Sequence, residues 1–137
     1  MNWDFTGVSW IAVLIAAVVG LVIGFVWYAP GVFGRRWAQA AGVELLAPSQ
    51  VPPITIVAAI VTVLVTAYAL AVLARAVGAA TIADGAILGF IAWLGFVATW
   101  TLSAVTFERK PWVYWYLNAG QGLVSLVVMG AIIGALK

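Results

Sequence analysis

The feature that most constrains the fold is a set of long segments without a single charged residue. A bilayer's hydrocarbon core is about 30 Å thick, and an α-helix needs roughly 20 apolar residues to cross it. Each uncharged segment is long enough for one crossing: Phe5–Gly34, Leu45–Ala74, Gly85–Phe107 and Pro111–Leu136. The sequence therefore predicts an all-α polytopic membrane protein, folded as a bundle of four transmembrane helices.

The composition supports the same fold class. Hydrophobic residues make up 66% of the chain and charged residues 7%, whereas a soluble domain is about one-quarter charged. Four crossings in 137 residues leave little chain for an extramembrane module, so we expect one domain over residues 1–137. Six basic and four acidic residues are too few for a nucleic-acid footprint, and we expect no nucleic-acid partner.

Prolines, glycines and capping residues predict where the helices begin and end. Asp84 is expected to be the N-cap of the third helix, which then starts at Gly85. A short interfacial helix is expected at Arg35–Ala41, with Trp37 turned toward lipid. The first apolar block lacks a preceding basic residue and is longer than a signal-peptide core, so we expect a retained span. The predicted spans are residues 9–28, 54–77, 85–105 and 112–136.

Basic residues that flank the spans predict the orientation, since cytoplasmic loops carry an excess of lysine and arginine. The first and third connections hold four of them: Arg35, Arg36, Arg109 and Lys110. The opposite side holds two: Arg75 and Lys137. We therefore expect both termini outside and both basic connections in the cytoplasm.

The four basic residues of the first and third connections allow two interpretations. An arginine fork suits phosphate, so this group is a candidate site for an anionic lipid headgroup. Alternatively the residues only set the topology, and Glu108 pairs locally with one of them. We favour topology alone, with the headgroup site as the functional alternative.

Residues able to carry out chemistry are largely missing from the spans. The chain has no histidine and no cysteine, and no acidic residue lies inside a predicted span. Metal sites, nucleophile–base pairs, proton relays and haem ligation all depend on such groups. We expect no catalytic, metal or cofactor-binding residue, no cofactor and no enzymatic activity. A proton-coupled exporter that needs a membrane-embedded glutamate is disfavoured for the same reason.

Uncharged polar residues form a row in the last span. Asn118, Gln121 and Ser125 stand at i, i+3 and i+7, which places them on one helical face. One interpretation is interhelical hydrogen bonding, for which the candidate partners are Thr62, Thr66, Thr99, Thr101 and Ser103. The other is the lining of a path for a small polar solute. We favour hydrogen bonding, and we expect Trp93 to be a packing residue.

Glycines spaced four apart form a further pattern. Three such pairs occur: Gly20 with Gly24, Gly85 with Gly89, and Gly130 with Gly134. Small residues at this spacing let helix backbones approach closely in a membrane. We expect at least one pair to pack within the chain and the surplus to serve a homo-oligomer or a larger complex.

Several motifs together resemble a known family. These are WYAPGVFGRRW after the first span, GAILGFIAWLGFVAT in the third, the FERKPW connection, and NAG followed by LVSLVVMGAIIGA in the fourth. The chain resembles, over almost its whole length, the bacterial membrane family catalogued as domain of unknown function 1761. Gln121 and Gly122 depart from an aromatic residue followed by histidine in many relatives. The resemblance implies the four-span architecture and no biochemical activity.

Two functional classes remain open. The first is a non-enzymatic accessory or structural subunit of the bacterial inner membrane that packs by small-residue faces and contacts anionic lipid. The second is a small channel or facilitator for an uncharged or weakly polar solute, formed as a homo-oligomer. The absence of a buried ionisable residue favours the first class. The expected partners are membrane lipids and either further copies of the chain or a larger membrane complex.

Overall fold

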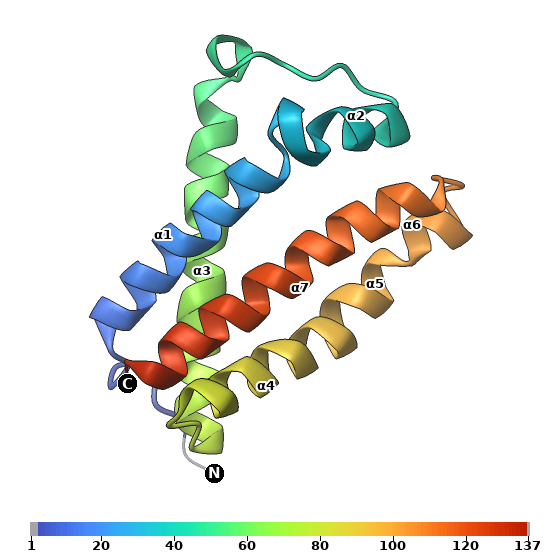
Figure 1. Cartoon of the computed structure of the whole chain (residues 1–137). Helices are drawn as coiled ribbons and strands as arrows, with labels where there is room; N and C mark the ends of the chain where they lie inside the picture. Colours follow the sequence, from blue (N-terminus) through green and yellow to red (C-terminus); the bar gives the residue numbers. More distant parts are fainter. Residues whose placement is uncertain (1–2, 137) are drawn as a thin grey trace.

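The computed structural model describes residues 3–136 and is built from helices. Within these residues, four helices are long and apolar enough to cross a membrane: Trp10–Trp27, Pro53–Val77, Ile82–Thr106 and Trp112–Ala135. The first, second and fourth are α1, α3 and α7 (Figure 1). The predicted all-α, four-span fold class is therefore confirmed.

Local signals explain most helix boundaries. The Ser9 hydroxyl oxygen accepts a hydrogen bond from the Ala12 backbone N–H and caps α1. Pro53 occupies the first position of α3, where its missing N–H costs nothing, and Gly78 ends that helix in the left-handed region at φ 74°. The short helix α2, Arg35–Ala41, has the predicted bounds and ends at Gly42 with φ 75°.

The predicted start of the third span was wrong. The helix begins at Ile82 instead of Gly85, and its N-cap is Thr81 instead of Asp84. The Thr81 hydroxyl oxygen accepts from the Asp84 N–H, while the Asp84 carboxylate accepts from the Ala80 N–H. Asp84 and Thr81 thus cap the helix start together. The Asp84 carboxylate lies in the first turn, where its negative charge interacts favourably with the positive end of the helix dipole.

The third span is continuous but irregular. It consists of α4 (Ile82–Ala92), a π-helical segment (Trp93–Ala98), α5 (Thr99–Thr101) and α6 (Ser103–Thr106), with a break at Leu102. The Trp93 indole N–H donates to the Ala119 carbonyl of α7 at 2.7 Å, beside the start of the π-helical segment. Such segments are rare in helices and common at functional sites.

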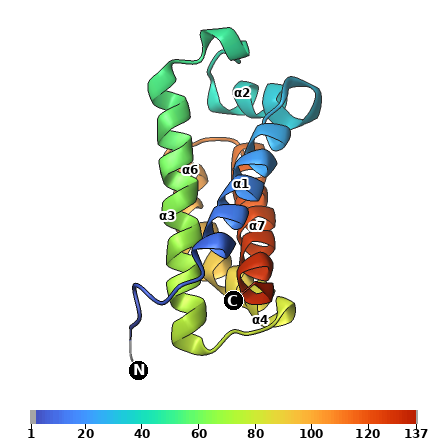
Figure 2. The same cartoon turned by 90° about the vertical axis from the view of Figure 1, so that its left-hand side faces the viewer.

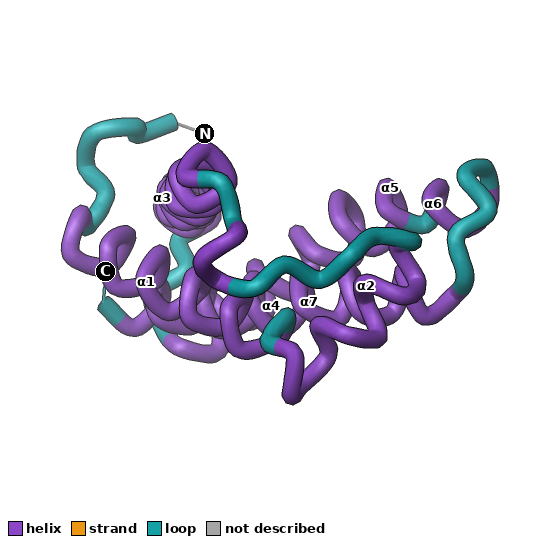
Figure 3. The backbone as a smooth tube through the Cα atoms, turned by 90° about the horizontal axis from the view of Figure 1, so that it is seen from above, coloured by secondary structure: helices purple, strands orange, loops and turns teal. Residues whose placement is uncertain are grey.

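The spans form one layer of near-parallel helices crossed by α3. In Figure 1, α1, α7 and the third span run side by side, whereas Figure 3 shows α3 viewed nearly along its axis. The buried residues of α3 lie in its second half: Ala67, Leu70, Ala71, Val72 and Ala74. They meet α1 and α7 around Met129, a side chain only 1% exposed.

The first half of α3 stands apart from this core (Figure 2). Its apolar side chains are exposed, with Ile54 at 71% and Val61 at 51% of their full exposure. The end of α1 and the beginning of α7 lie at the same end of the molecule as α2, while the start of α1 and the end of α7 lie at the other (Figure 2). The first and last spans therefore run in opposite directions, as expected for a chain with an even number of crossings.

Candidate functional site

The two basic connections meet at one end of the molecule. Helix α2 packs against α7, and the Lys110 ammonium donates to the Ala41 carbonyl at the end of α2, 2.9 Å away. The ammonium also lies 5.7 Å from the centre of the Tyr114 ring, within cation–π range. We call α2 and residues 107–111, which carry Arg35, Arg36, Arg109 and Lys110, the basic end.

Three of the basic residues at this end are exposed: Arg35, Arg36 and Arg109. Glu108 forms no ion pair within residues 3–136, so its expected local pairing was wrong. Arg109 has a φ of 60°, a left-handed conformation rare outside glycine, which lets the chain turn sharply before α7. The three guanidinium groups are therefore on the outer surface of the basic end.

Aromatic side chains hold the basic end in place, and the sequence predicts them at the membrane boundary but not their contacts with one another. Trp27 packs on Phe33 with ring centres 4.6 Å apart, and Tyr28 meets the half-buried Trp37 edge-on at 5.5 Å. Trp37 therefore faces the protein more than the expected lipid. A Cβ added to Gly120 would lie 3.2 Å from the Trp27 ring, so Trp27 rests on α7 where a glycine leaves room. Consecutive aromatic residues at the end of a span were the available signal.

The polar row of α7 is satisfied locally. The Tyr28 hydroxyl donates to the Asn118 side-chain oxygen at 2.6 Å, and the Gln121 amide donates to the Ser125 hydroxyl at 2.7 Å. Of the three α7 residues, only Ser125 is fully buried. The polar row thus makes one hydrogen bond to Tyr28 at the end of α1 and one hydrogen bond within α7.

The threonines expected to partner this row lie elsewhere. Thr62 is exposed on the first half of α3, and the Thr66 hydroxyl donates to the Thr62 carbonyl of the same helix. Thr99, Thr101 and Ser103 likewise donate to backbone carbonyls of the third span. The expectation of interhelical bonds from these hydroxyls was wrong, because back-bonding within a helix is the nearer alternative.

The glycine pairs lie inside the molecule. A Cβ at Gly85 would overlap the Gly130 carbonyl oxygen, and one at Gly89 would overlap the Leu126 carbonyl oxygen. Gly130 and Gly134 meet the backbone of Gly85 and Thr81 in return. Backbone contact along α4 and α7 at this distance is open only to glycine.

The third glycine pair faces α3 and α7. A Cβ at Gly20 would lie 2.7 Å from the Met129 sulfur and 2.8 Å from Val63 Cγ2, whereas one at Gly24 would lie 3.8 Å from the Gln121 nitrogen. All three pairs therefore take part in packing within the chain, although Gly24 is only half-buried, and their use by a further copy or a larger complex stays a prediction.

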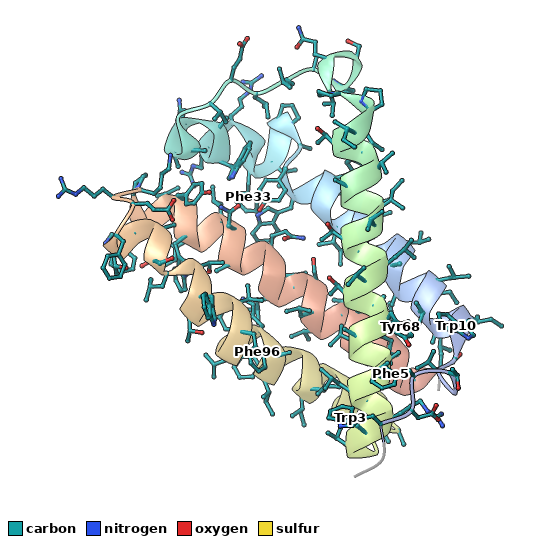
Figure 4. The ribbon with its side chains drawn as sticks, turned by 180° about the vertical axis from the view of Figure 1, so that it is seen from behind. Trp3, Phe5, Trp10, Phe33, Tyr68 and Phe96 are labelled. Atoms are coloured by element: carbon teal, nitrogen blue, oxygen red, sulfur yellow. The ribbon has the colours of Figure 1, made fainter. Side chains whose placement is uncertain are left out.

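The opposite end of the molecule is tied together by the segment before α1. The Arg75 guanidinium bonds the Asp4 carboxylate at 2.7 Å, and the Tyr68 hydroxyl donates to the Phe5 carbonyl at 2.5 Å. Trp10 and Tyr68 stack with ring centres 5.4 Å apart (Figure 4). A cavity of about 320 Å³ lies beside Arg75, walled mainly by glycine and alanine.

Stability is expected to depend on the ionisation of Asp4. The Gly7 backbone N–H, the Arg75 guanidinium and the Thr6 N–H hold the pKa of Asp4 below its ordinary value. A lowered pKa in the folded state contributes stability above the ordinary aspartate pKa, and that contribution is lost as the pH falls through the folded value. The unfolding midpoints of wild type and Asp4→Asn in detergent are expected to differ at pH 7 and to converge below about pH 4.

The control for this comparison is Glu44→Gln, which removes a carboxylate that has no hydrogen-bond or ion-pair partner in the part of the chain that the structure describes. That variant is expected to follow wild type at both pH values. A gap between wild type and Asp4→Asn that persists unchanged at pH 3 would contradict the assignment, because protonated aspartate no longer bonds Arg75 as an ion.

Comparison with known proteins gives one family. The model of the family described as "Protein of unknown function (DUF1761)" matches residues 11–134 of the chain. No curated protein and no solved structure matches the chain. The match runs from the first turn of α1 to the last turn of α7, so it covers all four spans and the basic end. The chain therefore belongs to the DUF1761 family of proteins of unknown function.

Proposed function

We propose that this protein is a non-enzymatic membrane protein that binds anionic lipid headgroups at its basic end and serves as an accessory subunit in a bacterial plasma membrane. The observation that carries the proposal is the meeting of α2 with residues 107–111 through the Lys110 to Ala41 bond. It brings two connections, 69 residues apart in sequence, to one surface. Their positive charges then act on the same headgroup region.

Charge and exposure favour phosphate as the ligand of this surface. Arg35, Arg36 and Arg109 are exposed, and each basic residue near an anionic leaflet contributes roughly 1 kcal/mol of attraction. The exposed rings of Trp100, Phe107 and Trp112 lie on the neighbouring segments, as expected for residues at a membrane interface. On this proposal the basic end is cytoplasmic, and both termini lie outside.

The test is lipid retention by the full chain in nanodiscs that contain phosphatidylglycerol and phosphatidylcholine. Native mass spectrometry of the released protein counts the lipids retained. Arg35→Gln combined with Arg109→Gln is expected to lower the retention of phosphatidylglycerol over phosphatidylcholine by about tenfold or more, since two charges supply roughly 2 kcal/mol. The control is Arg75→Gln, which removes a positive charge at the opposite end and is expected to leave that ratio unchanged. An equal ratio for wild type and the double variant would refute headgroup binding at the basic end.

The accessory role is supported by the uncovered first half of α3. Its exposed side chains are apolar, and the glycine pairs that were expected to reach a partner are used within the chain. We propose that another copy or a larger membrane complex packs along this half of α3. A stoichiometric companion retained after mild extraction supports this role.

The channel alternative has less support. Asn118 and Gln121, its candidate lining residues, are bonded to Tyr28 and Ser125 and so already have protein partners. Solute flux into sealed proteoliposomes that is lost when both residues are changed to leucine would favour it.

A further inference from the structure

A small pocket lies at the basic end between the third span and α7. It has a volume of about 220 Å³, and its polar lining comes from Thr101, Ser103 and Glu108 on one side and Tyr114, Trp115 and Asn118 on the other. The sequence patterns considered above did not place these six residues together, since they come from α5, α6, the following turn and α7.

The irregular end of the third span lines this pocket. Residues two apart on a regular helix point in different directions, yet Thr101 and Ser103 both line the pocket. Leu102 between them keeps helical dihedral angles, φ −61° and ψ −25°, and the Val105 N–H bonds back to its carbonyl only three residues earlier, so the helix is locally irregular here. The Trp115 indole N–H donates to the Ala98 carbonyl at 3.2 Å and ties α7 to the end of the π-helical segment. The end of the third span and the beginning of α7 therefore form the two walls of the pocket.

The donors and acceptors that the lining residues still have available limit what the pocket can recognise. The hydroxyl hydrogens of Thr101 and Ser103 are donated to the carbonyls of Val97 and Trp100, so each oxygen can meet a ligand only as an acceptor. The Glu108 carboxylate accepts only, and within residues 3–136 it has no ion-pair partner. The Asn118 amide nitrogen and the Tyr114 hydroxyl can still donate, but the acidic group and the two hydroxyl oxygens make acceptors the larger set, which suits a ligand that brings several N–H groups.

The charge and the rings point to an ammonium group. An alkylammonium has three donors and no acceptor, matching a carboxylate with two hydroxyl oxygens, and the ring of Trp115 favours a cation, whereas the Tyr114 ring already faces the Lys110 ammonium. A hard metal ion fits less well, because it takes about six oxygen ligands and the pocket supplies one carboxylate. The described residues hold no cluster of three acidic, histidine or cysteine side chains that could bind a metal.

The neighbouring charges restrict the ligand further. Arg109 and Lys110 follow Glu108 directly in the chain; Arg109 is exposed, and the Lys110 ammonium bonds the Ala41 carbonyl at 2.9 Å. A ligand with a phosphate one short linker away from its ammonium would meet both signs. A simple amine would meet only Glu108, beside two positive charges that repel it.

We propose that this pocket holds the ammonium of an aminophospholipid headgroup, with the phosphate of the same lipid at the adjacent basic residues. The proposal rests on the proposed lipid contact of the basic end and adds selectivity for a primary ammonium to it. A trimethylammonium headgroup is rejected, because it carries no N–H donors for Glu108, Thr101 and Ser103.

The experiment uses the full chain in nanodiscs containing phosphatidylethanolamine, phosphatidylcholine and phosphatidylglycerol with identical acyl chains. Native mass spectrometry counts each lipid that the released protein retains. Wild type is expected to retain phosphatidylethanolamine over phosphatidylcholine by about tenfold, a ratio typical of a charged hydrogen bond. Glu108→Gln is expected to reduce that preference to near unity while leaving phosphatidylglycerol retention unchanged or higher. Thr101→Val, which removes one acceptor and keeps the shape, is expected to reduce the preference about threefold.

The matched control is Glu44→Gln, which removes one exposed carboxylate from the connection between α2 and α3 and is expected to keep the wild-type preference. A preference unaffected by Glu108→Gln, or absent in wild type, overturns the ammonium pocket. If the ammonium pocket is overturned but phosphatidylglycerol retention still falls in the Arg35→Gln and Arg109→Gln double variant, the proposed binding of anionic headgroups at the basic end stands without the pocket. Millimolar soluble glycerophosphoethanolamine carries the same headgroup and is expected to lower the retention of phosphatidylethanolamine, and no competition at all would overturn headgroup recognition by the pocket.

Discussion

Replacing Gly89 by alanine is expected to destabilise the protein by about 3 kcal/mol or more, near the upper end of the cost of overpacking. An added Cβ would overlap the Leu126 carbonyl oxygen and approach Val127 Cα at 3.0 Å, and both atoms belong to the backbone of α7. A side chain could rotate away, but a backbone cannot. The α4 and α7 helices would have to separate along their whole contact, including the neighbouring Gly85 and Gly130. The measurement is the unfolding free energy in mixed micelles, followed by tryptophan fluorescence.

Gly95→Ala is the matched control for this variant. Gly95 lies in the same span, and a Cβ added there would meet nothing within 4 Å. The change is expected to leave the unfolding free energy unchanged or to raise it by up to about 1 kcal/mol, because alanine is the better helix former. If Gly89→Ala were as stable as Gly95→Ala, the two backbones would not be in contact at this point.

The four spans were predictable because the signal for a membrane helix is long and redundant. More than twenty uncharged residues in a row leave the backbone no solution except a helix that satisfies its own hydrogen bonds. The start of the third span was the exception. Asp84 and Thr81 both suit a cap, and the choice between them depends on the Asp84 carboxylate reaching the Ala80 N–H, a contact that only the folded chain reveals.

The candidate sites were less predictable, because their geometry depends on which helices meet. The spacing of Asn118, Gln121 and Ser125 correctly implied a shared face, but not that Tyr28 would bond Asn118. The glycine spacing implied close packing, but not that Gly85 would meet Gly130. The break at Leu102 has no breaker residue in the sequence to announce it, so the pocket beside α7 could not be predicted.

Small residues and aromatic residues divide the packing between the two ends. Near the end of α7, glycines let backbones touch, which strengthens the dispersion attraction that lipid would otherwise supply. Toward the basic end the helices are held by rings and their polar atoms, through Trp93, Trp115 and Tyr28. Backbone contact thus holds α4 against α7 at one end, and side-chain contact holds the third span against α7 at the other.

The core around Met129 gives the second large effect. Met129→Ala removes the largest fully buried side chain and is expected to cost about 2 to 4 kcal/mol in unfolding free energy, because the atoms that line the resulting void no longer have a dispersion partner. Gly20→Ala alone is expected to cost about 1 to 2 kcal/mol, because the new Cβ would press on the Met129 sulfur at 2.7 Å and on Val63 Cγ2 at 2.8 Å.

The two changes are expected to compensate each other when combined. With alanine at 129 the sulfur is gone, and the methyl group at position 20 fills part of the void, so the double variant should be more stable than the sum of the single effects by roughly 1 kcal/mol. Gly24→Ala with Met129→Ala is the control cycle and should be additive, because a Cβ at Gly24 would approach Gln121 and not Met129. An additive Gly20 and Met129 cycle, measured under the same unfolding conditions, would mean that α1 and α7 do not share this part of the core.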